Sequence, residues 1–187
     1  MIPLVSLWVP VLLSAVLVFI ISSLIHTVLQ YHNTDMKKLP DEDKIADALR
    51  SLNAPHGAYV LPHAGGMAEM KSPEFKAKWE RGPRAVIMIA KGGKMSMTPH
   101  MLQWFGYCLV VSIFAAYIAS RAVAPGAPYL TVFRFAGATA FFCYGVATWQ
   151  ESIWMGRPWS TTIKNTIDAL VYGLFTAGVF GWLWPQA

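Results

Sequence analysis

The sequence has 187 residues, of which 55% are hydrophobic and only 13% are charged, and its mean hydropathy is positive. Soluble domains carry about 25% charged residues, so this composition excludes an ordinary soluble protein and indicates a membrane protein. The net charge is +5, so we expect contact with anionic membrane lipids. The basic residues alternate with acidic ones along the chain, so we expect no binding of nucleic acid.

The first apolar segment, residues 1–25, contains no charged residue and is rich in Leu, Val and Ile. It is longer than the roughly 20 residues that a helix needs to cross about 30 Å of hydrocarbon. We predict a first transmembrane helix over residues 1–30. No basic residue precedes the segment and no small-residue cleavage site follows it, so we expect an uncleaved anchor rather than a signal peptide.

The hydrophilic stretch 31–99 is predicted to form a small α+β domain. The stretch 39–52 is predicted to form a short amphipathic helix, with acidic residues in its first turn and Arg50 in its last. Ser72 caps a second predicted helix that stops at Gly82. Segments 57–62 and 84–90 are predicted strands, each bounded by glycine or proline. A unit of this size buries little apolar surface, so we expect it to depend on the membrane helices for stability.

Residues 100–187 are predicted to contain three further transmembrane helices, over about 101–120, 129–149 and 163–184. Short links with proline and glycine separate them, which is typical of antiparallel neighbours. The predicted fold class is therefore an all-α membrane helix bundle of four transmembrane helices. A small α+β cytoplasmic loop domain lies between the first and second of them.

The distribution of basic residues predicts the orientation. Eleven of the fifteen Lys and Arg lie between Lys37 and Lys94. Basic loops stay on the cytoplasmic side, so the long loop should be cytoplasmic and both termini periplasmic. We expect a multi-pass protein of a bacterial inner membrane.

If the four predicted helices cross the membrane in alternating directions, several polar residues lie at the cytoplasmic leaflet. Imidazole and carboxylate groups suit zinc, copper or non-haem iron, or else transfer protons. The candidate metal ligands are His26, His32, Asp35, His100, Glu151 and Asp168.

Two simpler interpretations compete with this metal site. On a continuous helix, His26 and His32 would point about 120° apart, which prevents chelation from one face and favours ordinary interfacial residues. Asp35 would then cap or solvate the helix exit. Asp168 can pair with Lys164, which precedes it by four residues.

Other features predict packing or anchoring. Arg134 can reach the interface or hold a lipid phosphate or partner. Gly173, Ala177 and Gly181 form a small-residue face for close helix packing. Cys108 and Cys143 are expected to be core thiols rather than a disulfide. No motif assigns catalytic residues, and neither haem nor nucleotide is expected.

Five segments together resemble a family of four-span bacterial inner-membrane proteins labelled hypothetical, with no assigned function. These segments are SSLIHTVLQYH, KLPDEDKI, FRFAGATAF, WQESIW and WSTTIKNTIDALVYG. The resemblance covers most of the chain. It implies an inner-membrane location and assigns no activity or functional residues.

The sequence favours a non-enzymatic accessory or assembly subunit of a larger membrane complex, because the chain is small and largely apolar. Its partners would be other membrane subunits or further copies of itself. The alternative is a metal-binding or redox-linked membrane protein with a His and carboxylate site. A weaker alternative is a small proton-coupled transporter.

Overall fold

The structure is a computed structural model that describes residues 2–186. It is mostly helical and divides into two compact units. The helical unit comprises the residues up to Asp35 together with those from Ser96 onward, and the loop unit comprises Met36–Met95. The predicted loop domain, 31–99, is thus longer than the observed unit, because residues 31–35 pack within the helical unit.

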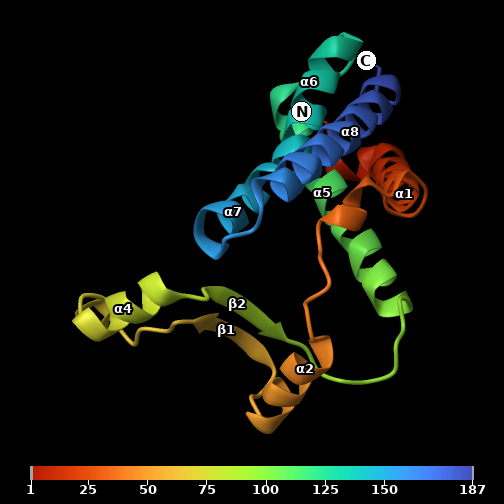
Figure 1. The fold of residues 1–187 in the computed structure, drawn as a ribbon. Helices are drawn as coiled ribbons and strands as arrows, with labels where there is room; N and C mark the ends of the chain where they lie inside the picture. The colour runs from red at the N-terminus through yellow and green to blue at the C-terminus, as the bar shows by residue number, and fades with distance from the viewer. Residues whose placement is uncertain (1, 187) are drawn as a thin grey trace. The chain divides into compact units, whose positions relative to one another are not determined.

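The elements of the helical unit are the 3-10 turn Leu4–Leu7, α1 (Trp8–Leu24), α5 (Thr98–Ala122), α6 (Tyr129–Tyr144), a 3-10 turn at Val146–Thr148, α7 (Trp149–Met155) and α8 (Trp159–Trp182). In this unit, short connections join α5, α6, α7 and α8, whereas the chain passes through the loop unit between α1 and α5 (Figure 1). Alanine and valine side chains dominate the buried interior where α1, α5, α6 and α8 meet. Such small residues allow membrane helices to pack closely.

Among the described residues, three helices are long and apolar enough to cross a membrane: Leu4–Leu29, Thr98–Ala122 and Tyr129–Met155. Helix α8 is not one of them, although it has 24 residues. Lys164, Asn165 and Asp168 near its start reduce its hydropathy. The predicted count of four spans therefore stays a prediction.

Helices α6 and α8 lie side by side (Figure 1) and pack through small residues. A Cβ atom on Gly137 would lie 2.7 Å from the Cβ of Ala177 and 3.3 Å from the carbonyl oxygen of Gly173. One on Gly181 would meet the ring of Tyr129 at 2.6 Å. The face formed by Gly173, Ala177 and Gly181 is thus occupied by α6 of the same chain.

The loop unit contains one antiparallel strand pair and three helices. Strand β1 (Gly57–Leu61) pairs with β2 (Ala85–Ile89), with Tyr59 opposite Ile87. The helices are α2 (Glu42–Ser51), α3 (Met67–Met70) and α4 (Pro73–Arg81). The two predicted strands and the two predicted helices are confirmed.

Local chemistry explains the confirmed α4 boundary. The Ser72 hydroxyl accepts a hydrogen bond from the backbone N–H of Phe75 at 3.1 Å, as an N-cap does. Phe75 is the only large apolar side chain of this unit that is buried. The loop unit therefore has very little core of its own.

The helix predicted over residues 1–30 is not continuous. Regular α-helix ends at Leu24, a wider π turn follows over Ile25–Leu29, and Gln30 takes the left-handed conformation with φ of 53°. A 3-10 turn then covers Tyr31–Thr34. Left-handed backbone is uncommon for residues other than glycine and ends a helix, so the chain changes direction at Gln30.

We predict opposite effects for alanine at two helical glycines. Gly137→Ala should destabilise the fold by about 1–3 kcal/mol, because its methyl group would overlap Ala177. Gly106→Ala on α5 meets no atom within 4 Å and should stabilise the helix by about 0.5–1 kcal/mol. Thermal unfolding of both variants in detergent tests this pair, and a shift of the same sign in both would contradict the packing described.

Candidate metal centre

The turn after α1 brings two histidines together. The rings of His26 and His32 stack with centroids 4.6 Å apart and planes inclined by 6°. The sequence-based argument that these residues diverge by about 120° assumed a continuous helix and is therefore wrong. The π turn and the left-handed Gln30 fold the second histidine back over the first.

A buried aspartate from α8 completes this group. Asp168 is 4% exposed, and its Oδ2 lies 2.8 Å from Nε2 of His32. The Tyr31 hydroxyl donates to its other carboxylate oxygen. Nδ1 of His32 lies 2.6 Å from Oδ2 of Asp35. Because carboxylates only accept hydrogen bonds, both ring nitrogens of His32 carry protons when both aspartates are ionised.

Lys164 supplies the second positive charge. Its Nζ donates to Oδ1 of Asp35 at 2.7 Å, to the carbonyl of Tyr31 at 2.7 Å and to Oγ1 of Thr34 at 2.8 Å. The expected pairing of Lys164 with Asp168 is therefore wrong, since each residue binds a different part of segment 31–35. The contacts tie the turn after α1 to the start of α8.

The charges around Asp35 also determine its protonation. Burial acts to raise the pKa of Asp35, but hydrogen bonds from Lys164 and His32 outweigh it and hold the pKa below its usual 3.8. Asp35 is therefore ionised at neutral pH. It neutralises the Lys164 ammonium group and orients the His32 ring.

Three ligand atoms converge at this point. One ring nitrogen each from His26 and His32 and one oxygen of Asp168 all lie within 4.8 Å of one another. Nδ1 of His26 lies 2.9 Å from the carbonyl of Ser22, which accepts only, so this bond places the proton on Nδ1 and a lone pair on Nε2. Metal-binding histidines are commonly held through the second nitrogen by a carbonyl or carboxylate, as both are here.

The other predicted ligands lie apart from this cluster. His100 is exposed in the first turn of α5, and Glu151 on α7 forms an ion pair with Arg157. Asp35 contacts His32 without joining the three converging atoms. Arg134 is exposed on α6, as a lipid or partner anchor would require. Sequence reasoning missed Tyr31, because nothing in the spacing indicates a contact with a residue 137 positions away.

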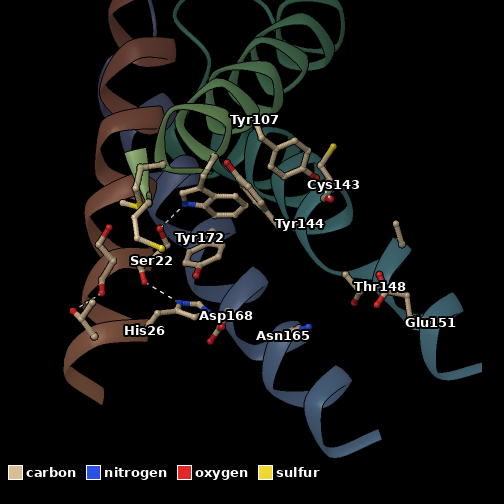
Figure 2. A pocket seen from close by; sticks show the side chains of 16 residues that line it. Ser22, His26, Tyr107, Cys143, Tyr144, Thr148, Glu151, Asn165, Asp168 and Tyr172 are labelled. Carbon is tan, nitrogen blue, oxygen red and sulfur yellow. Dashed lines mark hydrogen bonds between the residues drawn. The ribbon is translucent and has the colours of Figure 1, made fainter. Parts of the chain in front are cut away.

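A cavity of about 740 Å³ adjoins the cluster (Figure 2). His26 and Asp168 lie on one side of it, and Thr148 and Glu151 lie on the other. Four aromatic residues form a further wall: Trp104, Tyr107, Tyr144 and Tyr172. Two of the three converging groups thus border an open space, where a bound ion could take an additional ligand.

The Lys164 and Asp35 pair should contribute measurably to stability. Their side chains are 23% and 13% exposed, whereas those of the pair Arg50 and Asp47 on α2 are 72% and 75% exposed. A double-mutant cycle with Lys164→Met and Asp35→Asn should give a coupling energy of about 1–3 kcal/mol. The control cycle with Arg50→Met and Asp47→Asn should give about 0.5 kcal/mol or less.

Unfolding in denaturant provides the measurement for both cycles. Equal coupling energies in the two cycles would contradict the structural role given to Lys164.

No protein-family model matches the sequence, and searches among curated proteins and solved structures find no match. The function must therefore be judged from the site itself. That site combines two histidines and one aspartate, each held by neighbouring groups, beside a cavity between apolar helices.

Proposed function

We propose that this protein is a multi-pass membrane protein that binds a transition metal ion at His26, His32 and Asp168. The main observation behind this proposal is that one ring nitrogen from each histidine and one oxygen of Asp168 lie within 4.8 Å of one another. Supporting it, each histidine has its Nδ1 engaged by an acceptor, which leaves Nε2 for the ion. Two imidazoles and one carboxylate with an open position are a donor set for zinc or non-haem iron(II).

Metal binding changes the protonation of the cluster. The ion would take the place of a proton on Nε2 of His32, so binding would release that proton and should strengthen as the pH rises. A charge of +2 would then stand between the ring nitrogens and Asp168. The hydrogen bonds of Asp35 with Lys164 and His32 would remain.

We further propose that α8 crosses the membrane as a fourth span. Its 24 residues measure about 36 Å as a helix, which exceeds the hydrocarbon thickness of about 30 Å. It packs along α6, from Gly145 against Ala169 to Tyr129 against Gly181. Its charged residues Lys164 and Asp168 are paired with segment 31–35, which reduces the cost of placing them near the apolar region.

The membrane is proposed to be a bacterial inner membrane, with the loop unit in the cytoplasm and both termini in the periplasm. This orientation rests on the eleven basic residues between Lys37 and Lys94. Membrane lipids would then contact the exposed apolar faces of the helices.

Metal analysis tests the site directly. Purified protein should bind one zinc or iron(II) ion per chain, measured by calorimetry and elemental analysis after dialysis. His26→Ala, His32→Ala and Asp168→Ala should each lose stoichiometric binding. Asp35→Ala should retain the site but weaken it by about 10- to 100-fold, because it only orients His32.

Two matched controls separate specific binding from general metal affinity. His100→Ala removes an exposed histidine of the same unit, and Glu151→Gln removes a carboxylate charge across the cavity. Both should bind like the unchanged protein. Binding that is lost equally in the controls, or that survives in all three ligand variants, would refute the site.

A second function, as an accessory or assembly subunit of a larger membrane complex, is favoured by a different observation. The loop unit buries a single large apolar side chain, Phe75, while Leu52 is 69%, Met67 67% and Met88 71% exposed. A unit with so little buried apolar surface gains stability when a partner covers its exposed apolar side chains. We propose that a partner subunit or a second copy of the chain covers them. Such a role is compatible with a bound metal ion.

Cysteine labelling tests both the orientation and the covered surface. In a background with Cys108 and Cys143 replaced, Asp47→Cys on the polar face of α2 should react with an impermeant maleimide only after the cells are opened. Leu52→Cys should be protected in native membranes and react in purified protein, where the partner is absent. Labelling of Asp47→Cys in intact cells would refute the orientation, and equal reactivity of the two positions in membranes would refute a covering partner.

A further inference from the structure

The cavity beside the metal centre has features that metal binding does not use. Its aromatic wall is continuous: the ring centroids of Tyr144 and Tyr172 lie 5.3 Å apart, and those of Trp104 and Tyr144 lie 6.1 Å apart. Met97 and Met101 extend the apolar lining. At about 740 Å³ the cavity falls within the range of sites that hold small organic ligands.

Two hydroxyl groups that line this cavity, those of Tyr144 and Tyr172, make no hydrogen bond to another described residue. Tyr172 is 4% exposed, yet its hydroxyl makes no hydrogen bond to any other residue between positions 2 and 186. Figure 2 shows the ring of Tyr172 directed toward His26 and Asp168, so the hydroxyl lies at the polar end of the cavity. This hydroxyl has no protein partner and borders the cavity, so it is free to donate a hydrogen bond to a ligand oxygen there.

Tyr107 and Trp104 differ from Tyr172, because their polar atoms already have partners. The hydroxyl of Tyr107 donates to the carbonyl of Cys143 at 2.7 Å, and the indole N–H of Trp104 donates to Oγ of Ser22 at 2.7 Å. Tyr107 and Trp104 therefore contribute apolar ring surface, while Tyr172 contributes a free donor. These three residues suit a ligand that has a flat apolar body and an oxygen at one end.

The charges of the cavity exclude two other ligand classes. No Lys or Arg is among the described residues that line it, so a phosphate headgroup would find no cation there. Its two carboxylates are already engaged, Asp168 with His32 and Tyr31 and Glu151 with Arg157. An organic cation would therefore find no free counter-charge.

We propose that this cavity binds the ring of a lipid-soluble quinone, with one carbonyl oxygen accepting a hydrogen bond from the hydroxyl of Tyr172. The ring packs against Trp104 and Tyr144, where aromatic surfaces interact favourably. The apolar tail extends toward lipid between the helices. The proposal concerns binding alone and does not require a metal ion.

Binding of a benzoquinone with a ten-carbon tail tests the proposal. The full-length protein, treated with a chelator, is reconstituted in lipid nanodiscs, and bound quinone is measured by equilibrium dialysis. We expect saturable binding of one quinone per chain. Tyr172→Phe keeps the ring and removes the hydroxyl, so the Kd should rise by roughly 3- to 10-fold.

Two further variants complete the test. Tyr107→Phe also removes one hydroxyl from the same wall, but that hydroxyl is engaged with Cys143, so the Kd should change by less than about 2-fold. Ala147→Trp places a large ring at a residue that lines the cavity and should abolish saturable binding. If Ala147→Trp does not fold, the matched Tyr172 and Tyr107 variants still decide the question.

Several outcomes would overturn the proposal. Non-saturable uptake would show partition into lipid only. Equal Kd values for the unchanged protein and Tyr172→Phe would show that the Tyr172 hydroxyl makes no hydrogen bond to the quinone. Displacement of the quinone by decanol at equal concentration would show recognition of the tail rather than the ring. Because the protein is free of metal in this assay, failure here leaves the metal proposal standing, and the reverse also holds.

Discussion

The contact between Asp168 on α8 and Nε2 of His32 is the constraint on which the rest of the site depends. A carboxylate that is 4% exposed in an apolar helix unit is costly unless it is paired and hydrogen-bonded. Its partners His32 and Tyr31 come from the segment after α1. That segment can reach α8 only because the helix stops and turns at Gln30.

The same contact links the structural role of these residues to the metal-binding role proposed for them. Without an ion, Lys164 is bound to Asp35, and the two ring nitrogens of His32 lie between Asp35 and Asp168, so the polar atoms of the cluster have partners within it. An ion that replaced the proton on Nε2 would occupy a position whose surroundings already stabilise positive charge. Binding would also require one imidazole ring to leave the stacked arrangement, because the lone pair of a ring nitrogen lies in the ring plane and the two planes are nearly parallel.

The packing of the helices leaves a cavity open beside the cluster of His26, His32 and Asp168. Glycine and alanine bring α6 and α8 into close contact, while the larger rings of Trp104, Tyr144 and Tyr172 gather where α5, α6 and α8 face the end of α1. The polar residues His26 and Thr27 of the turn after α1 border the open volume beside these rings.

The sequence by itself determined the apolar character of the chain, the positions of three helices long and apolar enough to cross a membrane, and the strands and main helices of the loop unit. Hydropathy, caps and turn residues act over a few neighbouring positions, so a local pattern is sufficient to predict them. The sequence identified His26, His32 and Asp168 only within a larger set that included His100 and Glu151. Tertiary structure selected these three, broke the helix at Gln30 and directed Lys164 to Asp35 instead of Asp168. These choices depend on contacts between residues more than 120 positions apart, which no local pattern encodes.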